Sequence, residues 1–277
     1  MNLQGKYRET TQPLKELFFG SHLLSLFGHP YAINRTGLKQ SIKELADLTK
    51  PGPTIDIGCG IMPYRSLFKQ HDPYEGIEIE TRHKDRNKLA THFYDGNTLP
   101  LADNSYSSVL CFQVLEHCLN PELMLQECHR VLKKGGTLLL TMPLIWPEHE
   151  QPWDFQRFTS YGIARHLEKS GFKIERLDKV NPGLACIIQI SIDWIDAIHR
   201  RISRRISNRF ARRALLVAWR IWTAPAYTLG NIIAALARSN SKRFHPKSGA
   251  NNKSASEELY LDLAVVATKV VANEHSF

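Results

Sequence analysis

The stretch TIDIGCGIMPYRSLF, residues 54–68, begins as a short apolar strand and runs directly into a turn that carries two glycines. Gly58 and Gly60 stand two residues apart, at the point where the strand ends and a helical pattern begins. Glycine has no Cβ, so it permits a positive φ and lets a bound molecule approach the main chain, at an entropic cost in the unfolded state. We therefore expect a ligand to bind at this turn.

Length and composition indicate a globular protein. The chain has 277 residues, of which 43% are hydrophobic, and this is enough for one large domain with an appendage. Its five cysteines show no CxxC spacing, which argues against a disulfide framework or a zinc knuckle. The N-terminal stretch carries charges of both signs and no export signal. We expect a cytoplasmic protein with reduced, packed thiols.

The net charge of +9 belongs to one segment of the chain. Between Ala185 and Ser256 the sequence has thirteen basic residues and only two acidic ones, while the remainder is close to neutral. The basicity is therefore local.

Apolar runs bounded by turn residues alternate with helical patterns over most of the chain. Such alternation predicts an α/β fold with a largely parallel sheet that is covered on both faces, and with ligands bound beyond the carboxyl ends of the strands. We expect a Rossmann-like, doubly wound, mostly parallel seven-stranded sheet with an α-helical insertion before the last strand. Strands are predicted at 54–57, 74–80, 106–114, 136–143, 172–180 and 260–271, and helices at 34–48, 65–70, 121–134 and 160–170.

This pattern divides the chain into four parts. We expect an N-terminal helical region at 1–50, a ligand-binding core at 51–182, a basic helical insertion at 183–256, and a final core strand with a tail at 257–277.

The glycine turn does not match a dinucleotide-binding fingerprint. That fingerprint needs a third glycine, and the sequence GCGIMP has Pro63 in its place. Glu78 follows at the end of the next predicted strand, where a carboxylate can accept hydrogen bonds from ribose hydroxyls. A ligand with a ribose but no pyrophosphate fits best.

These residues resemble the class I S-adenosylmethionine-dependent methyltransferases, of the type that includes many small-molecule methyltransferases. TIDIGCG (54–60) matches the first motif of that family, and YEGIEIE (74–80) matches the second. The third region and the following turn and strand are matched by 94–117 and 129–143. One departure is Ser107, where the family usually has an aspartate.

The resemblance covers roughly 37–180 and the final strand, and it implies S-adenosylmethionine as the cofactor. Asp56 and the glycine backbone would face the methionine part, Glu78 the ribose, and Asp95 the adenine amino group, with the Gly96 N–H beside it. The candidate cofactor-binding residues are Asp56, Gly58, Cys59, Gly60, Glu78, Asp95, Gly96 and Gln113.

The segment PEHEQPWDFQRFT (147–159) follows the strand at which an acceptor should lie. It resembles a pattern found in methyltransferases of surface polysaccharide and glycan pathways. His149 is the candidate general base toward a sugar hydroxyl, because an imidazole can accept a proton at neutral pH, and His117 is a second candidate. Candidate substrate-binding residues are Glu148, Asp154 and Arg157. In a purely structural alternative, Asp154, Arg157 and Thr159 pair and cap the next helix.

The insertion carries a basic amphipathic pattern over 195–220, in which isoleucines recur at helical spacing opposite arginines. One interpretation places it on an anionic membrane surface at the inner face of the membrane, where it would present a lipid-linked acceptor. In the other it forms a helical lid or a surface for a homo-oligomer. The uncharged run 221–237 is at the lower limit for a membrane span, so we expect interfacial or core helices.

The predicted function is methylation, most consistent with O-methylation of a glycan, glycolipid or other small-molecule acceptor. RNA methylation is an alternative, which is disfavoured because the arginines alternate with isoleucines rather than with stacking aromatics. A non-catalytic, membrane-associated cofactor-binding adaptor is a third possibility. No metal is predicted, because no cluster of histidines or carboxylates has a recognisable ligand spacing.

Overall fold

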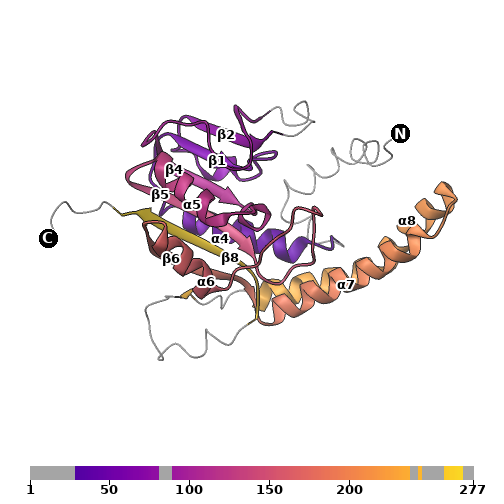
Figure 1. Cartoon of the computed structure of the whole chain (residues 1–277). Helices are drawn as coiled ribbons and strands as arrows, with labels where there is room; N and C mark the ends of the chain where they lie inside the picture. The colour runs from indigo at the N-terminus through magenta and orange to yellow at the C-terminus, as the bar shows by residue number, and fades with distance from the viewer. Residues whose placement is uncertain (1–28, 81–88, 238–242, 245–258, 271–277) are drawn as a thin grey trace. The chain divides into compact units, whose positions relative to one another are not determined.

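The computed structural model describes residues 29–80, 89–237, 243–244 and 259–270 (Figure 1). These residues fall into two compact units. The sheet unit holds 38–182, 243–244 and 259–270, and the helical unit holds 29–37 and 183–237. The predicted boundaries at 50, 182 and 256 remain predictions.

The sheet unit is built on one sheet with the strand order β3-β2-β1-β4-β5-β8-β6-β7 (Figure 1). Strands β1 to β5 pair in parallel, whereas β8 is antiparallel to both of its neighbours, β5 and β6. The predicted mostly parallel, doubly wound sheet is confirmed. The bounds are β1 Thr54–Ile57, β2 Tyr74–Ile79, β3 His92–Tyr94, β4 Tyr106–Phe112, β5 Leu132–Pro143, β6 Phe172–Pro182, β7 Arg243–Phe244 and β8 Tyr260–Lys269.

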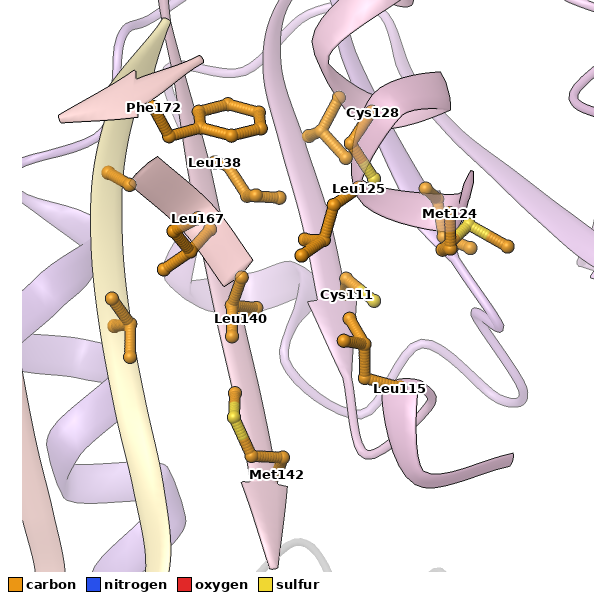
Figure 2. Packing of buried hydrophobic residues seen from close by; sticks show 14 of the residues in the cluster. Cys111, Leu115, Met124, Leu125, Cys128, Leu138, Leu140, Met142, Leu167 and Phe172 are labelled. Atoms are coloured by element: carbon orange, nitrogen blue, oxygen red, sulfur yellow. The ribbon is translucent and has the colours of Figure 1, made fainter. Parts of the chain in front are cut away.

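Two helices and the middle strands enclose the larger part of the core (Figure 2). Helix α5 (Pro121–Val131) and helix α6 (Ser160–Lys169) pack against strands β4, β5, β6 and β8. Proline fits the first turn of α5, where its missing N–H is not needed, and the Asn120 side chain caps that helix by accepting from Leu123 N–H. Side chains of this core include Cys111, Leu115, Leu125, Leu138, Leu140, Leu167 and Phe172.

Helix α4 (Ala32–Ala46) contributes to a second core cluster, on the other face of the sheet. Its residues Leu38, Ile42 and Leu45 pack with Leu139 of β5 and Val266 of β8. Helical spacing of apolar residues on α4 and alternation along the strands therefore bury both faces of the sheet, as expected.

Three local features differ from the sequence-based expectation. The stretch 65–70 forms only a short 3₁₀ turn, η1 (Arg65–Leu67), with no buried residue of its own. Strand β3 was not located from the sequence because it is three residues long. The two-residue strand β7 adds an eighth strand at the edge beside β6.

The helical unit contains two long helices, α7 (Leu184–Arg204) and α8 (Arg209–Ala237). The single basic amphipathic helix predicted over 195–220 is therefore wrong, because α7 ends at Arg204 and α8 begins at Arg209. The two helices pack around Ile192 and Tyr227. Neither these nor any other helix among the described residues is both long and apolar enough to cross a membrane. Residues 1–28, 238–242 and 245–256 of the predicted N-terminal and insertion regions lie outside the described residues.

Candidate active site

The glycine turn after β1 has the backbone geometry that its sequence predicts. Gly58 and Gly60 have φ angles of +63° and +49°. A Cβ on Gly58 would lie 2.5 Å from Cγ2 of Val114, so packing excludes any side chain there. A Cβ on Gly60 would meet no atom within 4 Å. The main chain at Gly60 is therefore open to a ligand, as S-adenosylmethionine binding requires.

Strands β1 and β2 end side by side, and this brings Glu78 to the glycine turn. Oε2 of Glu78 accepts a hydrogen bond of 3.1 Å from the Gly60 N–H. Asp95 directly follows β3, the next strand, and its Oδ1 accepts from the N–H groups of Asn97 and Thr98. These backbone hydrogen bonds lower the pKa of Asp95 and keep it an acceptor. Glu78 and Asp95, which are predicted to accept from the ribose and from the adenine amino group, thus lie at the ends of two neighbouring strands.

The other predicted cofactor residues line the inside of the turn rather than its rim. Asp56 is buried on β1, and its Oδ2 accepts a hydrogen bond of 2.8 Å from the Tyr74 hydroxyl. Cys59 is buried as well. Gln113, at the end of β4, donates from Nε2 to Oγ1 of Thr141 at 3.2 Å. These residues shape the turn, whereas Gly60 and Glu78 form its open edge.

A loop that follows β5 folds back onto the 3₁₀ turn η3 (Leu115–His117), which follows β4. Three hydrogen bonds fasten this acceptor loop, residues 144–159, to the turn and its flank. Nδ1 of His117 lies 2.6 Å from the Trp153 carbonyl oxygen, and the Phe155 N–H donates to the Glu116 carbonyl oxygen at 2.9 Å. The third runs from Nε2 of Gln156 to the Cys118 carbonyl oxygen, at 2.7 Å.

Asp154 is the centre of the acceptor loop. Both of its oxygens accept from the Arg157 guanidinium, at 2.5 and 2.8 Å. The same carboxylate accepts from the His149 N–H at 2.9 Å and lies 3.1 Å from Nδ1 of the His149 ring. The hydrogen bonds from Arg157 hold the pKa of Asp154 well below its usual range, so Asp154 is ionised. The predicted structural pairing of Asp154 and Arg157 is present, and it also orients His149.

The hydrogen-bond partners fix the protonation of two neighbouring imidazoles. Nδ1 of His117 faces a carbonyl oxygen, and Nδ1 of His149 faces the Asp154 carboxylate and, at 3.3 Å, the Pro147 carbonyl oxygen. Carbonyl and carboxylate oxygens only accept, so the Nδ1 atom is the donor in both rings, and Nε2 is the atom that carries the lone pair of the neutral ring. The ring centroids are 4.8 Å apart. The structure thus brings together the two predicted catalytic histidines.

Glu148 and Thr159 each make a local hydrogen bond in this region. Glu148 turns toward Gln151, from whose Nε2 it accepts at 3.1 Å. Thr159 caps α6 by accepting from the Gly162 N–H at 3.0 Å, as in the structural alternative.

Sequence analysis missed two buried carboxyl groups close to these histidines. Glu116 is fully buried, and burial together with the charge of Asp262 raises its pKa to about 8. Asp262 lies on β8, opposite Pro143 of β5, and burial raises its pKa to about 8. Asp262 could have been noticed as an acidic residue in an otherwise apolar strand.

Comparison with known proteins agrees with this geometry. Residues 55–140, which run from β1 through most of β5, match the family described as a methyltransferase domain. These residues form a methyltransferase domain of the class I S-adenosylmethionine-dependent type, and S-adenosylmethionine is its cofactor. It is an enzyme of methyl transfer.

Three relatives illustrate the range of the family. A thiol S-methyltransferase of Rattus norvegicus is 27% identical over 58% of this chain and 75% of that protein. A probable S-adenosylmethionine-dependent methyltransferase of Mycolicibacterium smegmatis is 32% identical over 28% of this chain and 32% of its own length. A malonyl-[acyl-carrier protein] O-methyltransferase of Alcanivorax borkumensis is 26% identical over 42% of this chain and 43% of its own length. Two of these names specify different acceptors and the third specifies none, so they do not identify the acceptor of this chain.

Proposed function

We propose that this methyltransferase transfers its methyl group to a hydroxyl oxygen of a glycan, glycolipid or similar small molecule. The acceptor would lie against the acceptor loop, between the loop and the open glycine turn. When bound, S-adenosylmethionine supplies a methyl group on a good leaving group, so the protein must align the acceptor and activate it.

One observation carries this proposal: the Nδ1 atoms of His149 and His117 both contact acceptor oxygens of the protein. Asp154 holds the His149 ring with its Nε2 lone pair available, and the Trp153 carbonyl does the same for His117. A hydroxyl group is a poor nucleophile until its proton is drawn away, and a basic nitrogen in a fixed orientation serves that need. His149 is therefore the residue that activates the acceptor, and Arg157 acts indirectly, by fixing Asp154.

A lipid-linked acceptor is favoured by the surface of the helical unit. Large apolar side chains along one face of α7 form an exposed stripe. One of them is Trp194, whose side chain is 66% exposed. Exposed arginines follow directly, at the end of α7 and the start of α8. Apolar side chains beside basic ones are typical of helices that lie on anionic lipid. The stripe is formed by Leu184, Ile187, Ile190, Trp194, Ile198 and Ile202, and the exposed arginines are Arg201, Arg204, Arg205, Arg209 and Arg213.

The acceptor class can be tested with methyl-labelled S-adenosylmethionine. The full chain is incubated with a membrane glycolipid extract, with a soluble glycan pool and, in parallel, with total RNA. We expect label in the glycolipid or glycan fraction, in a bond that resists mild base, as an ether does and a methyl ester does not. The His149→Ala variant, folded and bound to cofactor, should leave that fraction unlabelled. Label that enters RNA alone, or that is lost in mild base, would contradict the proposal.

A further inference from the structure

Three side chains that can bind a metal ion converge beside the acceptor loop: Glu116, His117 and His149. One ligand atom from each lies within 4.8 Å of the others. Nε2 of His117 is 3.8 Å from Oε1 of Glu116, which is too long for a hydrogen bond. Two ligands that share one ion at bonds of about 2.1 Å stand about 3 to 4 Å apart. The distance between His117 and Glu116 lies in this range, and all three ligand atoms lie within 4.8 Å of one another.

The buried carboxyl group of Glu116 is an independent indication of a binding site here. Its side chain is fully buried, and neither carboxylate oxygen has a hydrogen-bond partner among the described residues. A buried carboxyl group without a partner is costly, and buried charges in proteins are paired or bound to metal ions. Because Glu116 is enclosed while His117 and His149 are partly exposed, an acceptor molecule cannot reach Glu116 directly, whereas a small ion can lie between it and the two rings.

The surroundings of the two imidazoles are those of metal-binding histidines. Such histidines donate their second N–H to a carboxylate or a backbone carbonyl, and this fixes the ring and directs the other nitrogen at the ion. His149 has the Asp154 carboxylate in this position, and His117 has the Trp153 carbonyl.

We propose that Glu116, His117 and His149 bind one divalent transition-metal ion, such as Zn²⁺. Two imidazoles and one carboxylate suit such ions, and three protein ligands leave a coordination position open. The proposal rests on the proposed function and deepens it: His149 would hold the ion instead of accepting the hydroxyl proton itself, and the ion would lower the pKa of the acceptor hydroxyl. The hydroxyl proton leaves to solvent water, the oxygen forms the new O–CH₃ bond, and the S–CH₃ bond breaks with its electron pair on sulfur.

The test measures binding of Zn²⁺ to the full chain, free of any affinity tag, by calorimetry and by metal analysis after desalting. We expect about one equivalent of zinc per chain. Glu116→Gln keeps the shape of the side chain and should reduce binding at least tenfold, and Asp154→Asn should reduce it about tenfold through the ring it orients. His166→Gln is a matched control, because His166 also lies beside a glutamate, 3.3 Å from Glu122, but outside the cluster.

Zinc binding weaker than about 100 μM, or equal in wild type and Glu116→Gln, would overturn the proposal. A cooperative thermal unfolding transition shows that each variant is folded. If zinc raises the unfolding midpoint of the wild-type protein but not that of Glu116→Gln, the site is supported. A chelator-treated protein that methylates a glycan at the full rate would overturn the ion and leave the proposed function intact. Tight, Glu116-dependent zinc binding by a protein that methylates no hydroxyl acceptor would support the site and contradict the proposed function.

Discussion

The Tyr74 hydroxyl donates a hydrogen bond of 2.8 Å to Oδ2 of Asp56, from β2 to the neighbouring strand β1. Asp56 is only 3% exposed, and burial raises its pKa to about 7 despite the lowering effect of that hydrogen bond. The unfolded chain releases the same proton near pH 4. The folded state therefore binds a proton that the unfolded state has lost, and stability from this group falls as pH rises between about 4 and about 7.

Replacing Asp56 by asparagine should remove this pH dependence. The free energy of unfolding of wild type, relative to Asp56→Asn, should decline by on the order of 1.4 kcal/mol per pH unit across that window. Urea unfolding of both proteins at about pH 5 and about pH 8 measures the difference. Equal pH slopes in the two proteins would show that Asp56 titrates in the folded state as it does in the unfolded chain.

Glu78 is expected to carry much of the affinity for the ribose of the cofactor. A hydrogen bond to a charged group contributes about 1.5 to 3 kcal/mol, so Glu78→Ala should weaken S-adenosylmethionine binding by about 10- to 100-fold. Calorimetry measures the dissociation constant. Glu175→Ala, an exposed glutamate on the distant strand β6, should leave it unchanged. If the dissociation constant of Glu78→Ala equals that of wild type, Glu78 does not bind the ribose.

His149→Ala should separate turnover from cofactor binding. Loss of a group that activates the acceptor lowers the rate by about 100-fold or more, while the dissociation constant of S-adenosylmethionine stays near its wild-type value. Methyl transfer to the acceptor found in the labelling experiment gives the rate, and His166→Ala provides the control. Turnover at the wild-type rate in His149→Ala would remove this residue from the mechanism.

The arginines at the end of α7 should determine binding to lipid. Each basic residue near an anionic surface contributes about 1 kcal/mol, so the change of Arg201, Arg204 and Arg205 to glutamine should weaken binding by about 100-fold. Co-sedimentation with vesicles of anionic phospholipid at low salt measures this. Changing Lys133, Lys134 and Lys173 of the sheet unit to glutamine leaves the net charge equally reduced and should have little effect. Docking on anionic lipid would be contradicted if the wild-type protein did not sediment with the vesicles. It would also be contradicted if the arginine and lysine variants lost the same amount of binding.

Arg200 is left out of that variant because it is engaged inside the helical unit. Its guanidinium pairs with Asp193 and Asp196 and donates to the Tyr31 hydroxyl at 3.1 Å. A substitution there would test the packing of the unit rather than its charge.

The sheet could be predicted from the sequence because its signals are local. A continuous apolar run such as 260–269 indicates a buried strand, and a proline such as Pro121 marks a helix start, within a few positions along the chain. The break between α7 and α8 could not, because Ile206 and Phe210 continue the helical spacing across it. The spacing of apolar residues indicates which face of a helix each residue would lie on. It does not indicate where the helix ends.

The site was predictable only in part, for a related reason. The positions of Gly58, Gly60 and Glu78 follow from the ends of the strands that precede them. Parallel strands bring their carboxyl ends to one edge of the sheet, and this does not depend on the side chains. The approach of His149 to His117 depends on how the acceptor loop returns to η3, and that path is set by side-chain bonds such as those of Arg157. A metal site was not predicted from the sequence, because Glu116, His117 and His149 share no motif spacing.

Strand β8 lies between β5 and β6 in the sheet, although it follows both of them in the sequence. The sheet is therefore completed by an inner strand. During synthesis the ribosome must release residues as late as Lys269 before those two strands gain their shared neighbour. Until then the inner edges of β5 and β6 present unpaired backbone groups and apolar side chains to the cell. A nascent chain of this protein thus has a long period in which a chaperone, rather than its own last strand, must cover the centre of its core.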